Sequence, residues 1–290
     1  MEPLVETKSL TKDFGSQRGI FSLDFTISPG EIVGFVGPNG AGKSTTINLL
    51  AGNIKPTSGT IKLFGRAVSP ESIHAFMPEI GLMLSEPTIE NNLTAHQIFA
   101  EAEQLLQKKT EWKRLGDLLK LDTAKPVSKL SLGNKKKIEI VLALMHKPKL
   151  VIMDEPTSGI DPLIVTRFSA LLKEVSERGG AVLLSSHDLS EVQEVCDRVI
   201  MVKEGHLILD RPVEQLLKMS NRRFSVNKPS EKITSLLTAS FGDDVIRTTT
   251  GLTLQTRDYG RVIKLLSENK TYDFLIENPS LEEMFEAYYK

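Results

Sequence analysis

The sequence predicts an α/β protein with a smaller α+β unit at its carboxyl end. Three observations support this fold class. Two apolar runs, at 32–36 and 150–153, have the length of fully buried strands, and each is followed by a helical pattern. A glycine-rich loop joins the first of these strands to its helix. After about residue 220, short strand and helix patterns begin again behind a polar segment.

The composition is that of an ordinary globular protein. Of 290 residues, 40% are hydrophobic and 25% are charged, and the formal net charge is −1. A nearly neutral chain gives no sign of a nucleic-acid surface, and we expect no nucleic-acid partner. The single cysteine, Cys196, rules out an internal disulfide framework and fits a reducing compartment.

No segment reads as a signal peptide or a membrane span. The first residues lack a basic start followed by an apolar stretch, and no apolar run reaches the roughly 18 residues that cross a bilayer. We therefore expect a cytoplasmic protein whose contact with a membrane goes through a partner.

The elements are expected in two halves around a helical insert. Strands are predicted at 5–10, 21–27, 31–36 and 60–64, with a helix at 45–50. The insert, about 75–148, has helical patterns at 94–108, 111–121 and 132–146. The second half has strands at 150–153 and 181–184, helices at 162–177 and 189–196, a hairpin over 199–209 and a last helix near 212–218.

The domain boundary is placed at a polar linker, which gives a first domain of residues 1–220 and a second of 221–290. In the second domain we expect strands at 224–226, 244–248, 252–256 and 272–276 and helices at 231–240, 261–269 and 280–289. This unit carries no chemical motif, and its role is left open.

The glycine loop carries the clearest chemistry. Strand, G-x-x-x-x-G-K-[ST] and helix in that order predict a P-loop, in which backbone N–H groups and a helix N-terminus face phosphates. Lys43 would reach the β- and γ-phosphates, and Ser44 would bind Mg²⁺. The alternative is a turn without a ligand. The expected nucleotide-binding residues are Gly37, Pro38, Asn39, Gly40, Ala41, Gly42, Lys43, Ser44 and Thr45.

A pair of acids follows the second buried strand. Asp154 would hold Mg²⁺ through water, and Glu155 would face the terminal phosphate and act as general base. By themselves they could equally be solvated acids at a strand end. Beside a phosphate loop they predict a hydrolytic site.

Four motifs in order resemble those of ATP-binding cassette (ABC) ATPases. They are the P-loop at 37–45, Leu130-Ser131-Leu132-Gly133-Asn134, the segment 154–161 and Ser185-Ser186-His187. The resemblance covers residues 3 to about 215. It implies a P-loop NTPase core with an antiparallel β-subdomain and a helical insert.

The resemblance also implies residue roles. Phe14 matches the aromatic that stacks on adenine, and His187 matches the switch histidine that contacts the γ-phosphate. Ser131 and Gly133 match the signature motif, which binds the ATP held by a partner subunit. Seen alone, Ser131 would be a helix cap and Phe14 a packed aromatic. Asp161 matches the loop that links the two sites of a dimer.

Two positions depart from the family pattern. Leu132 stands where the signature motif usually has glycine, and Ser85 followed by Glu86 stands where a glutamine normally senses the γ-phosphate. Which of these two residues takes over that role is left open.

The segment containing Pro87 and Asn92-Leu93-Thr94, and the ending at 279–285, resemble the cassettes of bacitracin-type and ABC-2 exporters. The expected function is that of the ATP-hydrolysing subunit of an exporter for a peptide, antibiotic or lipid-like substrate, with ATP and Mg²⁺ as cofactors. The expected partners are an ABC-2-type membrane permease docked near 76–93 and a second copy or a homologous ATPase. The protein would lie on the inner face of the membrane.

The alternative is a regulatory or soluble ABC-type ATPase with residues 222–290 as the effector. Other notable residues have ordinary interpretations. Trp112 and Cys196 are expected to be packed in the interior, and Lys135, Lys136 and Lys137 are expected on a solvated helix face.

Overall fold

The computed structural model describes residues 2–85, 89, 92–219, 221–278 and 280–289. Glu86, Pro87 and Pro279, which were singled out above, lie outside this set. The chain divides into two compact units, Met1–Pro212 and Val213–Lys290. The boundary therefore precedes the last helix of the predicted first domain, rather than following it near residue 220. Each unit is described by itself.

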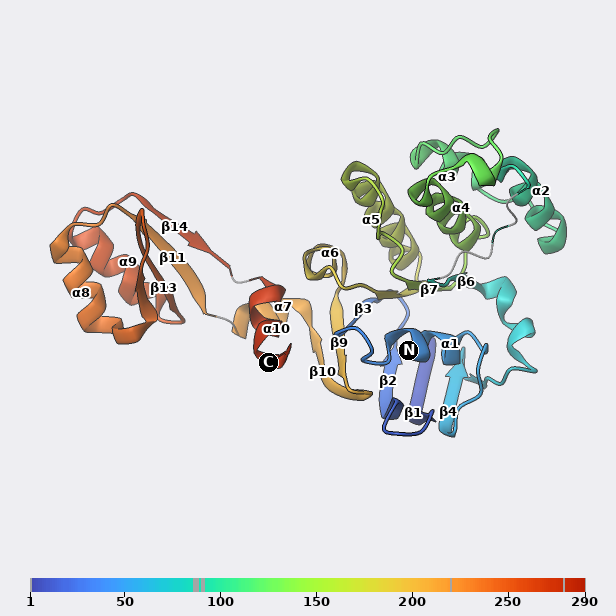
Figure 1. Cartoon of the computed structure of the whole chain (residues 1–290), viewed down its shortest axis with the longest axis horizontal. Helices are drawn as coiled ribbons and strands as arrows, with labels where there is room; N and C mark the ends of the chain where they lie inside the picture. The colour runs from blue at the N-terminus through green and yellow to red at the C-terminus, as the bar shows by residue number, and fades with distance from the viewer. Residues whose placement is uncertain (1, 86–88, 90–91, 220, 279, 290) are drawn as a thin grey trace. The chain divides into compact units, whose positions relative to one another are not determined.

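A mostly parallel sheet forms the centre of the first unit (Figure 1). Its strand order is β10-β9-β3-β8-β7-β6, with only β10 antiparallel to its neighbour. The strands are β3 (Ile32–Val36), β6 (Ile80–Met83), β7 (Leu150–Asp154), β8 (Ala181–Ser185), β9 (Arg198–Lys203) and β10 (His206–Pro212).

A smaller antiparallel sheet lies beside it, in the order β2-β1-β4-β5. Its strands are β1 (Val5–Asp13), β2 (Gly19–Ile27), β4 (Ser58–Leu63) and β5 (Arg66–Ala67). The antiparallel β-subdomain expected from the resemblance is confirmed.

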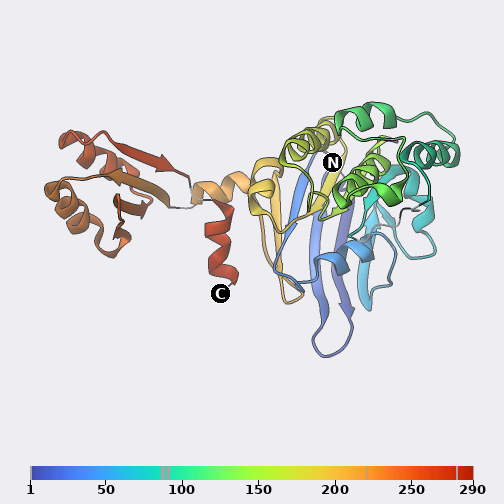
Figure 2. The same ribbon diagram turned by 45° about the horizontal axis from the view of Figure 1, so that its top comes forward.

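The helices of the first unit cover the central sheet on both faces. They are α1 (Lys43–Leu50), α2 (Ala95–Leu106), α3 (Trp112–Leu118), α4 (Leu132–Leu144), α5 (Pro162–Glu177) and α6 (Leu189–Val195), with short 3₁₀ turns at Ile73–Ala75, Met77–Glu79 and Val127–Lys129. Figures 1 and 2 show α4, α5 and α6 on one side of the sheet, and α1 with the antiparallel sheet on the other.

The alternation of side chains along the strands explains this layering. Val33 and Phe35 of β3 pack with α1 and the antiparallel sheet in one hydrophobic core. Gly34 faces the opposite side, where a Cβ would lie only 2.6 Å from Val192 of α6. Every residue of β3 is buried, as expected of a parallel strand covered on both faces.

The helical insert begins later than expected. Residues 80–83 belong to the central sheet as β6, paired with β7, although the predicted insert started at about 75. The helical part is therefore α2 to α4. Thr94 caps α2 in a capping box with Gln97, as its spacing predicts.

The second unit has the β-α-β-β-α-β order of a ferredoxin-like fold. Its antiparallel sheet has the strand order β12-β13-β11-β14. Residues of α8 and α9 pack with this sheet in the hydrophobic core of the unit. The elements are α7 (Val213–Met219), β11 (Arg222–Asn227), α8 (Glu231–Phe241), a 3₁₀ turn (Gly242–Asp244), β12 (Val245–Arg247), β13 (Gly251–Thr256), α9 (Tyr259–Glu268), β14 (Phe274–Glu277) and α10 (Leu281–Tyr289). These match the predicted elements closely.

Among the described residues, every helix is too short or too polar to cross a bilayer.

Candidate active site

Four neighbouring strands of the central sheet end at the candidate site. The P-loop follows β3, the Ser186–His187 segment follows β8, Asp154 and Glu155 lie at the end of β7, and Ser85 follows β6. Because neighbouring parallel strands point the same way, their carboxyl ends meet at one edge of the sheet. The fold thus brings together four segments that are far apart in the sequence.

The P-loop turns sharply between β3 and α1. Gly40 and Gly42 have φ angles of 82° and 107°, which residues with a Cβ atom rarely adopt. At Gly42 a Cβ would also lie 2.4 Å from Ile20. The loop therefore leads directly into the N-terminus of α1, where the first backbone N–H groups lack acceptors within the helix, as an anion site requires.

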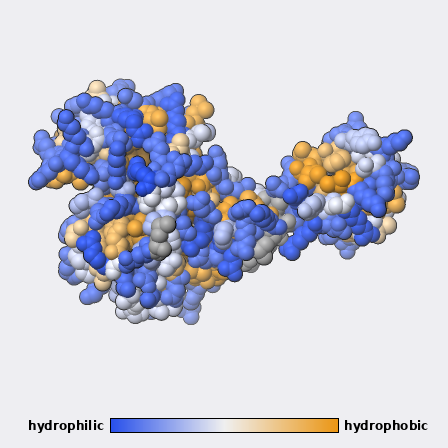
Figure 3. Space-filling model, turned by 180° about the vertical axis from the view of Figure 1, so that it is seen from behind, coloured by the Kyte–Doolittle hydropathy of each residue, from blue (hydrophilic) through white to orange (hydrophobic). Residues whose placement is uncertain are grey.

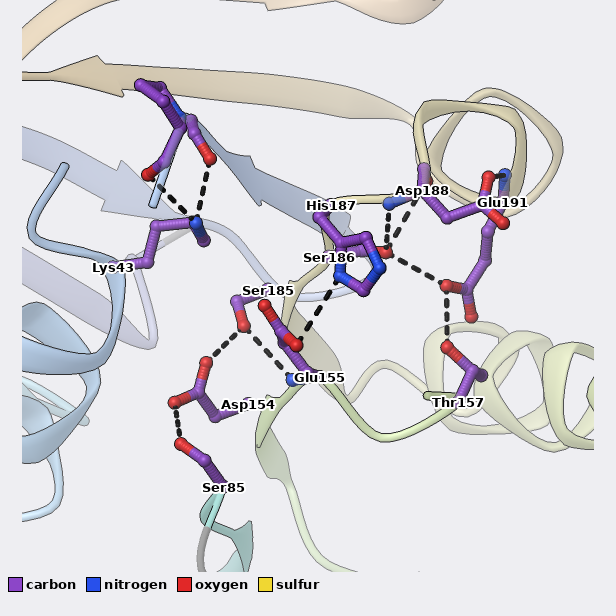
Figure 4. Close-up of polar contacts among 12 residues, drawn as sticks. Lys43, Ser85, Asp154, Glu155, Thr157, Ser185, Ser186, His187, Asp188 and Glu191 are labelled. Atoms are coloured by element: carbon purple, nitrogen blue, oxygen red, sulfur yellow. Dashed lines mark hydrogen bonds and ion pairs between the residues drawn. The ribbon is translucent and has the colours of Figure 1, made fainter. Parts of the chain in front are cut away.

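Lys43 is the first residue of α1, and its ammonium group is folded back on the loop. It donates to the carbonyl oxygens of Gly37, at 2.7 Å, and Pro38, at 3.2 Å. Burial lowers the pKa of Lys43, and the carboxylates of Glu155 and Asp154 partly oppose that effect. The positive charge is thus placed in the loop, close to two acids (Figure 4).

Asp154 is the last residue of β7 and is 2% exposed. Its two carboxylate oxygens accept hydrogen bonds from different strand ends, Oδ1 from Ser185 and Oδ2 from Ser85. Two hydroxyl donors therefore fix the carboxylate without neutralising its charge.

Glu155 and His187 meet across the ends of β7 and β8. His187 Nδ1 lies 3.4 Å from Glu155 Oε2. The backbone N–H of Glu155 donates to Ser185, and its φ of 48° puts the residue in the left-handed region. Such a conformation is uncommon for a residue with a side chain.

Two cavities meet at Glu155. One, of about 460 Å³, is lined by Phe14, by Lys43 and other P-loop residues, and by Glu155. The other, of about 500 Å³, is lined by Glu155, the 157–160 segment, His187 and part of α6. Phe14 is 52% exposed, so it is not the packed aromatic that its sequence context alone would favour.

The predicted signature residues lie elsewhere. Ser131 caps α4, where its hydroxyl accepts from the N–H of Asn134, and Leu132 beside it is 58% exposed. Gly133 approaches the 157–160 segment so closely that a Cβ would lie 2.6 Å from the Gly159 carbonyl oxygen. In the part of the chain described, neither Ser131 nor Gly133 lines the P-loop cavity. Asp161 caps α5.

Three residues in this region were missed by sequence reasoning or misplaced. Lys136 is buried, and its ammonium group donates to the Glu155 carbonyl oxygen at 2.8 Å, so the prediction of a solvated face was wrong for it. Ser185 and Glu191 were given no role. Ser185 could have been noticed because it ends a strand that pairs with the strand ending in Asp154. No comparable signal marks Glu191.

Comparisons with known proteins give the family. The ABC transporter family model matches residues 20–158. The bacitracin transport ATP-binding protein BcrA of Bacillus licheniformis is 37% identical over 229 residues, which cover 77% of this chain and 74% of BcrA. The uncharacterized ABC transporter ATP-binding protein YhcH of Bacillus subtilis (strain 168) is 32% identical over 98% of this chain and 95% of its own length.

Among solved structures, an ATP-binding subunit of an ABC transporter is 27% identical and superposes with a TM-score of 0.67, covering 74% of this chain and 92% of that one. The P-loop fold and the nucleotide-site geometry define a P-loop ATPase. The chain belongs to the ABC transporter ATP-binding proteins. It is accordingly an ATP hydrolase of that family, whose members work as dimers together with membrane permeases.

Proposed function

We propose that this chain powers export through an ABC-2-type membrane permease, from the inner face of the membrane. The observation that carries this proposal is that the P-loop, Asp154, Glu155 and His187 meet at one edge of the central sheet. The class of substrate follows from the relatives. Two of them are named for bacitracin transport and lantibiotic transport, which supports a peptide antibiotic or a similar amphiphile as cargo.

In this proposal the side chains have distinct roles. Phe14 stacks on adenine, and Lys43 with the loop N–H groups binds the phosphates. Glu155 takes a proton from the attacking water as general base, and His187, 3.4 Å away, orients the Glu155 carboxylate and contacts the γ-phosphate.

The residues present fit a magnesium ion. Ser44 lines the P-loop cavity, and Asp154 supplies a carboxylate at the end of β7. Hydroxyl and carboxylate oxygens are the ligands that Mg²⁺ prefers, and it commonly keeps several waters. Both Asp154 oxygens already accept hydroxyl donors, which favours binding through water. The ion would offset phosphate charge.

A complete site would need a second chain. Ser131 and Gly133 lie at the start of α4 and outside the P-loop cavity, so in this proposal they bind the nucleotide of a partner subunit, a second copy or a homologous ATPase. ATP would then hold two chains head to tail. Ser85, bonded to Asp154, is proposed to take the place of the switch glutamine.

The general-base assignment is tested with Glu155→Gln. The amide preserves shape but cannot accept a proton, so we expect turnover to fall by about 10²- to 10⁴-fold while ATP binding persists. Steady-state hydrolysis and ATP titration measure the two effects, and sedimentation with ATP should show the variant as a dimer. Glu177→Gln, at an exposed acid that ends α5, is the matched control. Near-normal hydrolysis by Glu155→Gln would remove Glu155 from the role.

The transport assignment is tested by co-purification from membranes. A tagged chain should recover a multispanning permease, with the described residues near 76–85 and 92–93 as candidate docking positions. Recovery with ribosomes or nucleic acid would instead support a soluble ATPase. The relatives named for transport do not favour that alternative or the regulatory one.

A further inference from the structure

Glu191 is a buried acid that the proposed mechanism leaves unused. It lies in the first turn of α6 and is only 7% exposed. Among the described residues no lysine or arginine forms an ion pair with it, and burial raises the pKa of its carboxyl group. Burying a carboxyl group without a cation is costly, so its presence calls for an explanation.

The contacts of Glu191 join two loops. Its Oε2 accepts a hydrogen bond from the Thr157 hydroxyl at 2.8 Å and another from the Ser186 hydroxyl at 3.1 Å. The first loop follows β7 and the second follows β8 (Figure 4). One oxygen atom therefore bridges the ends of two adjacent strands.

These two loops carry the pair of side chains at the centre of the site. Thr157 comes two residues after Glu155, and Ser186 directly precedes His187. Ser186 also accepts from the N–H of Asp188 at 3.0 Å, which fixes the backbone on the far side of His187. The separation of Glu155 and His187 thus depends on backbone segments that Glu191 holds from behind.

We propose that Glu191 is a positioning residue, whose buried carboxyl group holds the Glu155 and His187 loops at the separation at which these side chains meet. The inference rests on the proposed roles of Glu155 and His187. The second oxygen, Oε1, has no hydrogen-bond partner among the described residues, so the side chain acts through the two bonds of Oε2. Glu191 does not line the P-loop cavity, so nucleotide binding should not depend on it.

The Glu191→Gln variant tests whether the hydrogen bonds of this side chain matter or its ionisable group. Glu191→Gln keeps an oxygen that can accept from both hydroxyl groups, so turnover should stay within about threefold of wild type. Glu191→Leu removes both acceptors at similar volume, and turnover should fall by about 10- to 100-fold while the apparent ATP affinity changes by less than about threefold. A fall in kcat at constant KM, rescued by glutamine, would not follow from general loss of structure.

Combining Glu191→Leu with Thr157→Val tests whether Glu191 acts through its hydrogen bond to Thr157. Thr157→Val should lower turnover on its own, yet add less than about twofold in the Glu191→Leu background, because the same bridge is already lost. Glu177→Leu, at an exposed acid that ends α5, should leave turnover unchanged. Circular dichroism and thermal unfolding establish that each variant is folded.

The outcomes are separable from those of the proposed function. Wild-type turnover in a folded Glu191→Leu, or fully multiplicative effects with Thr157→Val, overturns the positioning role even if Glu155→Gln is inactive. Should Glu191→Leu not fold, Thr157→Val and Glu191→Gln decide. Normal turnover in Thr157→Val then overturns the proposal, whereas reduced turnover in Thr157→Val with near-normal Glu191→Gln supports it. If the wild-type protein did not hydrolyse ATP, that result would count against the proposed function instead.

Discussion

Two lysines in the site have lost most of their contact with water, and among the described residues neither forms an ion pair. Lys43 donates to the carbonyl oxygens of Gly37 and Pro38, and Lys136 donates to that of Glu155. Burial lowers the pKa of both ammonium groups. Charges held by carbonyl dipoles rather than by carboxylates remain available to an anion, which suits a site for phosphates.

Lys136 can be tested because it is buried and holds the backbone of the proposed base. Lys136→Met keeps the length of the side chain and removes the bond to Glu155. We expect turnover to fall about tenfold with little change in ATP affinity, because the carboxylate loses a backbone support. The free energy of unfolding should change by less than about 1 kcal/mol, since relief of desolvation offsets the lost bond.

Hydrolysis assays and urea unfolding measure these two quantities. Lys109→Met, at an exposed position before α3, is the control and should match wild type in both. Unchanged turnover in a folded Lys136→Met would mean that the bond to Glu155 is not needed for the reaction.

The residues that the sequence could not place are those whose surroundings are set by distant elements. Three consecutive lysines at 135–137 look alike in the sequence, and only the packing of α4 selects Lys136 for the interior. Glu191 is a second example, because its partners Thr157 and Ser186 lie in two other loops. By contrast, the strand, glycine loop and helix around 37–45 were predicted correctly from local spacing.

At the scale of elements, helix and strand assignments were mostly right where the pattern was long. The 162–177 helix was predicted to the residue, and the strands of the second unit were predicted to within two residues. The strand β6 was missed because it has only four residues, and its burial depends on pairing with β7, some 70 positions later. Length and local contacts determine what a sequence pattern can reveal.

The contact between β3 and α6 is tight enough to be tested by one methyl group. At Gly34 a Cβ would lie 2.6 Å from Val192 and 3.1 Å from the Cys196 sulfur. Gly34→Ala should therefore lower the free energy of unfolding by about 1–3 kcal/mol, because the interior is overpacked.

Gly116→Ala is the matched control for this change. Gly116 lies within α3, and the nearest atom to its Cβ would be at 3.8 Å, an ordinary contact. Alanine there should raise the free energy of unfolding by up to about 1 kcal/mol through helix propensity. Equal stability of the two variants in urea unfolding would contradict the close packing of β3 and α6.

His146 links the end of α4 to β6, and its position predicts a dependence of stability on pH. Its Nε2 lies 3.0 Å from the Ile80 carbonyl oxygen, and burial lowers the pKa of the imidazole from 6.5. The unfolded chain then binds the proton first as pH falls. The free energy of unfolding should decrease below about pH 6.5, by up to about 1.4 kcal/mol per pH unit.

His146→Gln should remove this part of the pH dependence. Urea unfolding at pH 7.5, 6.5 and 5.5 measures it as the difference in slope between the variant and wild type. Between pH 7.5 and 8.5, where the imidazole is neutral in both states, the two slopes should agree. A wild-type slope in the variant at low pH would assign the effect to other groups.

At the scale of the whole molecule, each unit has a hydrophobic core of its own among the described residues. One lies between the central and antiparallel sheets of the first unit, and the other is built from α8, α9 and the sheet of the second unit. On the view in Figure 3, apolar surface is scattered among polar side chains on both units. Each unit therefore has the core that independent folding requires.

Two units with cores of their own predict two unfolding transitions in calorimetry. ATP should raise the midpoint of one transition only, because the P-loop cavity belongs to the first unit. Leu237→Ala removes buried atoms from the second core and should lower the other midpoint, at a cost of about 2–5 kcal/mol. Leu183→Ala, in the first core, should have the converse effect. A single transition that shifts equally in both variants would contradict independent units.

The lone cysteine of the chain has a practical consequence. Cys196 is buried against Gly34 at the end of α6, and burial raises the pKa of its thiol, so little reactive thiolate forms at neutral pH. Native protein should thus be nearly silent toward maleimides. A single cysteine introduced at an exposed position, such as Lys129 before α4, could then carry a fluorophore without first deleting the natural one. Energy transfer between two such labelled chains would follow their approach and separation in real time during the ATP cycle.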